Sequence, residues 1–145
     1  MNRPEVEIIN RPKDADDVDL SELVYEFLDD EKTLDFSDVA IKSGTNLVFP
    51  MEVEGPAVYE MTITVNSDLN PVAQLPTSLY ENGILMQQFV FNGSEGMDTS
   101  ITKLVAIPRR FAVFRLFVRE AGMTVKSIKM TKTDQDPFKL LGWGE

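Results

Sequence analysis

The sequence contains neither cysteine nor histidine, and each absence excludes a kind of chemistry. Without cysteine, the chain has no disulfides and no thiolate to act as a nucleophile or a metal ligand. Without histidine, it lacks the commonest general base and the commonest ligand of transition metals. We therefore expect a protein that uses no cofactor.

Two kinds of segment are also missing. No apolar run approaches the roughly 20 residues that a membrane-spanning helix needs. The first ten residues, MNRPEVEIIN, do not place an apolar segment after a basic one, as a secretory signal does. If Met1 is the natural start, we expect the protein in the cytoplasm.

Basic residues are fewer than acidic ones. Lys and Arg together number 14 and Asp and Glu number 24, which gives a formal net charge of −10. A field of this sign repels phosphate backbones and anionic lipids, so we expect neither nucleic acid nor a membrane as a partner. The charge is uneven, because eleven acids lie within residues 14–38, whereas residues 109–132 hold seven bases and one acid.

A chain of 145 residues is long enough for one domain with its own core. Composition divides it into three parts. We expect an acidic arm with a short helix at 1–32, a β-sandwich at 33–133, and a tail at 134–145 that carries the one tryptophan, Trp143.

Apolar and polar residues alternate along much of the sandwich segment. From Tyr59 to Val65 every second residue is apolar, and the same holds from Ala112 to Val118. This period of two is typical of strands with one buried face and one wet face. We predict an all-β protein, an antiparallel two-sheet β-sandwich of the jelly-roll kind with one short N-terminal helix.

The dipeptide Asn82-Gly83 separates two strand segments, 77–81 and 84–91. Both central residues of a type I′ turn need positive φ, which asparagine and glycine tolerate best. We therefore predict a β-hairpin at this position.

Two positions predict irregular strands. Pro50 cannot donate a ladder hydrogen bond, so we expect it at an edge or a bulge. In the last strand the apolar residues change phase between Val125 and Ile128. A bulge near Lys126 and Ser127 would return both to the core.

A helix is predicted at residues 20–28. Asp19 and Glu22 have the spacing of a reciprocal N-terminal cap, and apolar residues then recur at helical spacing. Farther along, Phe111, Val113 and Phe117 form an apolar row on one face of their strand. An open sheet face seldom carries three such groups, so we expect the acidic helix to cover this row.

The order of strands and turns resembles a known family. It runs Gly55-Pro56, the strand YEMTITV, a hairpin at ENG, a glycine-rich loop at 92–96, then RRFAVFRLFV, AGM and VKSIKM. Over about Val53–Thr131 this resembles the β-sandwich carbohydrate-binding modules of family 6 and their relatives on glycoside hydrolases. The resemblance implies a module that binds sugar and catalyses no reaction.

The resemblance also implies where sugar would bind. These modules stack a sugar ring on tryptophans in a loop of the type G-W-x-x-W, and the matching loop here, 96–100, has Met97 and Ser100 at those positions. The nearest surviving positions are Asp98 and Thr124, with Phe49 as a candidate platform. We expect weak sugar binding by these three residues.

A structural calcium ion is not expected. Relatives often place an aspartate in the last strand where this chain has Lys126, and a cation there would repel the metal. Glu5 and Glu7 are similar to paired acids that some relatives use for calcium. We expect them to be solvated acids on an edge strand.

Three functions can be compared at this point. A non-catalytic accessory module with carbohydrate as its partner follows from the resemblance. A structural module that docks on a partner domain or subunit follows from the missing aromatic residues. We do not expect an enzyme, because spacing marks out no pair of carboxylates of the kind that glycosidases need.

Overall fold

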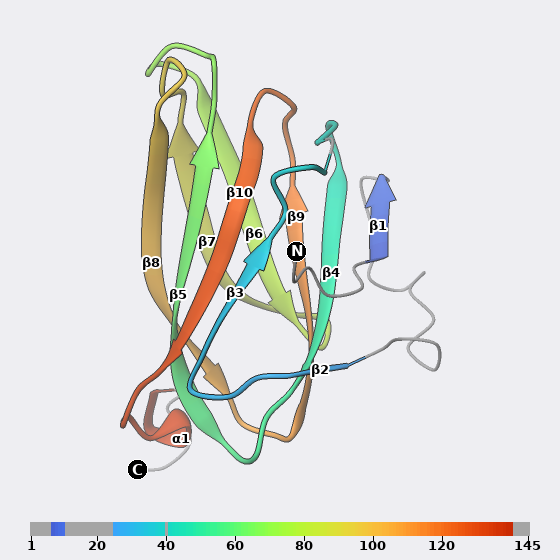
Figure 1. The fold of residues 1–145 in the computed structure, drawn as a ribbon, viewed down its shortest axis with the longest axis vertical. Helices are drawn as coiled ribbons and strands as arrows, with labels where there is room; N and C mark the ends of the chain where they lie inside the picture. The colour runs from blue at the N-terminus through green and yellow to red at the C-terminus, as the bar shows by residue number, and fades with distance from the viewer. Residues whose placement is uncertain (1–6, 11–24, 40, 141–145) are drawn as a thin grey trace.

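The computed structural model describes residues 7–10, 25–39 and 41–140, whose strands form two stacked β-sheets (Figure 1). The strands are β1 (Glu7–Asn10), β2 (Glu26–Phe27), β3 (Glu31–Asp35), β4 (Thr45–Glu52), β5 (Ala57–Asn66), β6 (Gln74–Glu81), β7 (Ile84–Asn92), β8 (Asp98–Ile107), β9 (Phe111–Val118) and β10 (Thr124–Lys132). The antiparallel two-sheet sandwich predicted from the sequence is confirmed.

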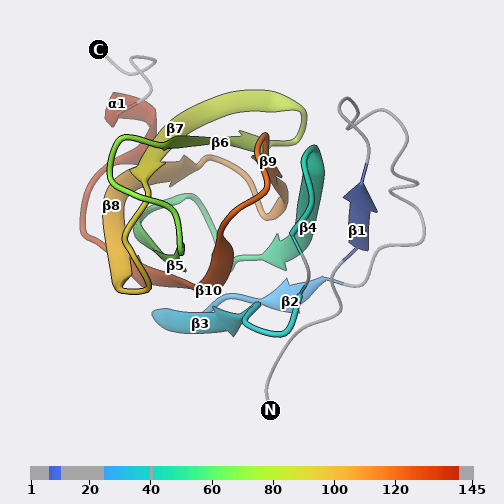
Figure 2. The ribbon, with the colours of Figure 1, turned by 90° about the horizontal axis from the view of Figure 1, so that it is seen from above.

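Each sheet has its own strand order. Sheet A runs β1-β4-β9-β6-β7, and β2 pairs with β4 in the parallel direction. Sheet B runs β3-β10-β5-β8. Seen from above in Figure 2, the two sheets curve around a common interior. Both β1 and β2 lie within the predicted arm at 1–32, so sheet A draws part of its strands from that segment.

The core fills the space between the sheets. In β5 the predicted alternation holds, because Tyr59, Met61, Ile63 and Val65 are buried while the residues between them are exposed or half-buried. In sheet A the ring of Phe49 stacks on Phe114 at a centroid distance of 5.4 Å. Phe36 follows β3 of sheet B, and its ring centroid lies 5.9 Å from that of Phe49. Aromatic contact therefore joins the two sheets.

Two turn features agree with the sequence. Asn82 and Gly83 have φ values of 51° and 84°, and the β6–β7 hairpin turns on them. In β10 the register with β5 shifts between Val125 and Ser127, which is the predicted bulge. Pro50 lies inside β4 at the point where its edge partner changes. Residues 45–48 pair with β1 and residues 51–52 pair with β2.

The predicted N-terminal helix is wrong in the part that the structure describes. Glu26 and Phe27 form β2, an extended segment that pairs with Met51 and Glu52. Ladder hydrogen bonds to β4 satisfy its backbone, so tertiary pairing overrides the local helical spacing. Residues 20–24 lie outside the described residues. Among the described residues, the helix is α1 (Pro137–Leu140), near the C-terminal end, and it is too short to span a membrane.

The apolar row on the outer face of β9 is partly covered. Phe111 remains 45% exposed, and the edge of the Tyr25 ring packs on it at a centroid distance of 5.2 Å. Val113 and Phe117 are half-buried. On the neighbouring strand β4, Val48 is fully buried although it points away from the core. The segment before β2 therefore contributes to the cover through Tyr25, without the helix that we predicted.

One carboxyl group lies inside the sandwich at the hairpin end. Glu81 is 4% exposed, and its Oε1 has no hydrogen-bond partner among the described residues. It lies opposite Phe114 in the β6–β9 register, so it shares the core face with that ring. Burial raises the pKa of Glu81 to about 7, and the nearby Arg109 opposes this rise.

We expect the stability of the protein to fall between pH 4.5 and about 7 because of Glu81. The folded state holds this proton more tightly than the unfolded chain does. The stabilisation is fully present below the ordinary pKa of 4.5 and is lost as the pH rises through about 7. The difference corresponds to about 3 kcal/mol. Urea unfolding at a series of pH values measures it.

The variant Glu81→Gln stays neutral at every pH and should be more stable than the wild type at pH 8, with the two converging at low pH. Glu60→Gln removes one negative charge from an exposed site and serves as the matched control. If the free energy of unfolding changed with pH in the same way for the wild type and Glu81→Gln, the raised pKa of Glu81 would be contradicted.

Candidate functional site

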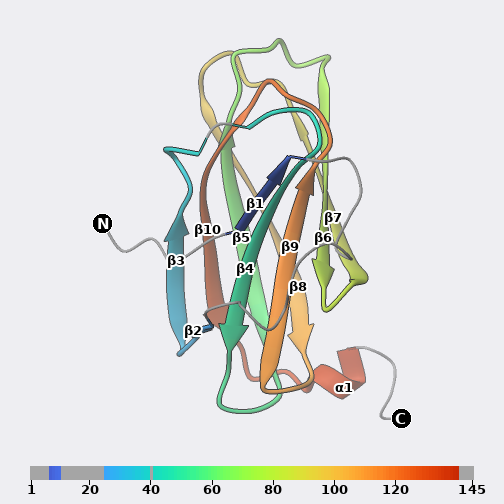
Figure 3. The same ribbon diagram turned by 90° about the vertical axis from the view of Figure 1, so that its right-hand side faces the viewer.

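Three loops are tied together at one end of the sandwich (Figure 3). They connect β5 to β6, β7 to β8, and β9 to β10. The Ser67 hydroxyl donates to the Gly122 carbonyl at 2.6 Å, which joins the first loop to the third. Ser94 in the second loop accepts from the Ser67 amide at 3.0 Å. This network fixes the loop end of the sandwich.

Glycine permits the close approach of the first two loops. A Cβ atom on Gly93 would lie 2.0 Å from the Asn70 carbonyl oxygen and 2.5 Å from that of Leu69. The Gly93 amide donates to the Ala73 carbonyl at 3.0 Å, and the Glu95 amide donates to the Leu69 carbonyl at 3.0 Å. The backbones of these two loops therefore pack directly on each other.

A polar row crosses sheet B beside these loops. In the strand registers Asp98 lies opposite Asn66, and Asn66 lies opposite Thr124. The Asn66 Nδ2 group donates to Asp98 Oδ1 at 2.8 Å and to the Gly96 carbonyl at 2.9 Å. Asp98 is exposed, and the other two residues are half-buried. The row therefore presents a carboxylate, an amide and a hydroxyl on one face.

Hydroxyl pairs continue this face along β5 and β8. Thr64 and Ser100 are 2.7 Å apart at their oxygens, and so are Thr62 and Thr102. Each pair satisfies part of its hydrogen-bonding capacity internally, which stabilises the sheet.

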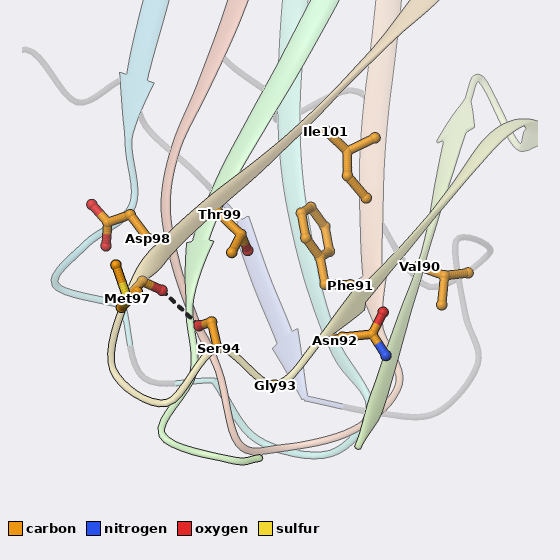
Figure 4. Close-up of a pocket in the computed structure, with 9 residues that line it drawn as sticks. All are labelled: Val90, Phe91, Asn92, Gly93, Ser94, Met97, Asp98, Thr99 and Ile101. Atoms are coloured by element: carbon orange, nitrogen blue, oxygen red, sulfur yellow. Dashed lines mark hydrogen bonds between the residues drawn. The ribbon is translucent and has the colours of Figure 1, made fainter. Parts of the chain in front are cut away.

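An open pocket of about 410 Å³ lies between the end of β7 and the start of β8, and Asp98 is the one residue of the row that lines it. Figure 4 shows Phe91 and Ile101 on its inner wall, with Ser94 and Met97 on the loop. Asp98 and Thr99 leave β8 on opposite sides. Met97 is 70% exposed, whereas Phe91 is buried. The pocket has an apolar floor and a polar rim.

Of the three residues predicted to contact sugar, two lie in the polar row and one lies in the core. Asp98 and Thr124, which are far apart in sequence, are brought into one row. Phe49 is fully buried between Phe36 and Phe114 and offers no face to a ligand. Its proposed role as a platform is therefore wrong. Phe49 lies on the core face of β4 because the outer face begins one residue away, at Val48 and Pro50.

The outer face of sheet A carries an aromatic and cationic pair that was not predicted from the sequence. The Arg115 guanidinium lies over the Tyr80 ring at 4.1 Å and donates to Asn46 Oδ1 at 2.6 Å. The alternation along β6 and β9 could have predicted this pair, because it places Tyr80 and Arg115 on the outward side of two adjacent strands. Arg115 already covers one face of the ring, which limits its use as a stacking surface.

No group of three or more acidic, cysteine or histidine side chains that could hold a metal ion occurs within 7–10, 25–39 and 41–140. Glu5 lies outside these ranges. Lys126, where the resemblance implied an aspartate in calcium-binding relatives, is half-buried beside the bulge of β10.

No family model matches the sequence. The chain is similar to a β-glucosidase from Ruminococcus albus, with 27% identity over 128 residues that make up 88% of this chain. Those residues are 13% of the length of that enzyme.

Solved structures share the fold. A β-glucosidase from Paenibacillus barengoltzii matches 68% of this chain over 10% of its own, with a TM-score of 0.54 and 15% identity. The C-terminal family 6 carbohydrate-binding module of a laminarinase from Zobellia galactanivorans matches 88% of this chain over its whole length, with a TM-score of 0.56 and 15% identity. Family 35 carbohydrate-binding modules also match. The resemblance predicted from the sequence is confirmed at the level of fold.

We expect Gly93→Ala to destabilise the protein by at least about 2 kcal/mol, because the added methyl group would overlap two backbone carbonyls. Gly55→Ala is the matched control, since no atom lies within 4 Å of its added Cβ. Urea unfolding measures both. Equal stability of the two variants would show that the loops separate without cost.

Proposed function

We propose that this chain is a non-catalytic accessory module of a glycoside-processing protein and that it binds sugar weakly at the loop end of the sandwich. The observation that carries the proposal is the row Asp98-Asn66-Thr124 on the outer face of sheet B, at the loop end. A carboxylate, an amide and a hydroxyl held at fixed spacing suit the hydroxyl groups of a sugar ring. The likeness in fold to carbohydrate-binding modules supports this reading.

A second observation supports a role without catalysis. Glycosidases usually need two carboxyl groups that face each other across a cleft. Asp98 is the one carboxylate among the described residues that line the pocket. Glu81, whose pKa is raised, is enclosed at the opposite end of β6. These acids have no common space for a substrate.

The lining of the pocket argues for low affinity. Ring stacking on an exposed aromatic side chain supplies much of the binding free energy in sugar recognition. Here the one aromatic residue that lines the pocket is the buried Phe91, and the exposed apolar residue is Met97. We expect dissociation constants near or above 1 mM, or about −4 kcal/mol.

The similarity to β-glucosidases supports the association with glycoside processing. In the two β-glucosidases that match, a segment of this kind occupies about a tenth of the chain. No aromatic ring is exposed at the loop end among the described residues, which favours the alternative, a structural module that docks on a partner domain. Sugar binding distinguishes the two.

We expect β-linked glucose oligosaccharides, titrated into the ¹⁵N-labelled protein, to shift the amide signals of Asp98, Asn66 and Thr124. The change should saturate only at millimolar sugar, because the contacts are hydrogen bonds exposed to water. Asp98→Ala should abolish the shifts. Glu60→Ala, which removes an acid from the far end of the same face of β5, should leave them unchanged.

No shift in this row at about 20 mM sugar would favour the structural alternative. Micromolar binding that survives Asp98→Ala would place the sugar elsewhere on the protein and contradict the assigned site.

A further inference from the structure

The β6–β7 hairpin is almost free of charge in a strongly acidic chain. Between Asp68 and Glu95 the sequence has one charged residue, Glu81, and that residue is buried. Across the whole chain 26% of residues are charged. The surface of the hairpin is therefore neutral.

The outer side of this hairpin carries apolar and amide side chains. The registers pair Tyr80 with Leu85, Ser78 with Gln88, and Pro76 with Val90 on the side away from the core. We call these six residues the hairpin face. Leu85 is 48% exposed and Val90 is 47% exposed, and Ile84 at the turn is 62% exposed.

The strand β7 differs from the other strands that end the two sheets. It is the last strand of sheet A, and the residues from Ile84 to Asn92 include no charge. Each of the other three end strands contains charged residues: Glu7 in β1, Glu31, Lys32 and Asp35 in β3, and Asp98 and Lys103 in β8. Charged side chains are the usual protection of an edge strand against association. Of these four strands, β7 alone contains no charged residue of its own.

We propose that the hairpin face is a self-association surface, on which two copies of this chain pack across a twofold axis. A twofold interface places the same patch against itself, so a patch that carries charge would repel its own copy. The hairpin face has no such charge. The Gln88 amide is both donor and acceptor and can pair with its symmetry mate.

Net charge favours a second copy at this face over contact elsewhere. Two chains that each carry −10 repel one another, and the repulsion is least where neither presents an acid. A strongly charged partner fits the uncharged hairpin face less well than a neutral one does. The cation next to the face in the register is Arg115, which already donates to Asn46 and lies over Tyr80. The occupant should therefore be as neutral as the face itself.

Sedimentation equilibrium of the wild-type chain over a concentration series tests the proposal. We expect the mass to rise from that of one chain toward that of two. Leu85→Lys combined with Val90→Lys should keep the single-chain mass throughout, because it restores charge to the strand. Val72→Lys places a positive charge on an apolar loop residue outside the hairpin face, 84% exposed, and should dimerise like the wild type.

Salt provides a second measurement that needs no variant. Because dimerisation buries neutral surface between two acidic chains, added sodium chloride should screen the repulsion and strengthen it. Three outcomes would each overturn the proposal. The wild type could remain a monomer at about 1 mM. The double lysine variant could still form the dimer, or added salt could dissociate it. Circular dichroism and thermal unfolding of the variants check that their fold is unchanged.

Discussion

The requirement that both sheets bury their alternate side chains in one shared interior governs the rest of this structure. Phe49 illustrates it, because its ring lies between Phe114 of its own sheet and Phe36 from the opposite layer. A residue that closes the core cannot also serve as a binding platform. Any ligand is left with the loops and the outer faces, where Phe27, Phe111 and Phe138 are the exposed aromatic residues within the described ranges.

The division between loop end and hairpin end follows from this arrangement. At the loop end, serine hydroxyls, backbone amides and the small residue Gly93 hold three loops in contact. Polar groups in that region already have partners, so they are fixed in place before a ligand arrives. Exposed apolar side chains occur at both ends, Ile84 and Leu85 at the hairpin and Val72 and Met97 at the loops. The loop end is therefore distinguished by its network of hydrogen bonds and not by an absence of exposed apolar groups.

Much of the fold could be predicted because the local signals are strong and agree with one another. The alternation in β5 and β9, the positive φ values at Asn82 and Gly83, and the bulge after Val125 each follow from a short stretch of sequence. The segment ending at Phe27 could not be predicted in this way. Its helical spacing is a local preference, whereas its strand pairing depends on β4, which is distant in sequence.

The site was predictable only in part for a similar reason. Asp98 and Thr124 were found through a resemblance in strand order, and strand pairing brings them together through Asn66. The wrong assignment of Phe49 and the missed pair of Tyr80 and Arg115 share one cause. Which face of a strand points inward depends on the sheet packed against it, and a shift of one residue exchanges the faces.

The buried Glu81 has a consequence for calorimetry. Between pH 4.5 and about 7 its carboxyl group holds a proton in the folded state and gives it up when the chain unfolds. That proton passes to the buffer, and each buffer binds it with its own heat. The measured enthalpy of unfolding will therefore include a contribution that changes with the buffer, and its variation from one buffer to another reports the number of protons released.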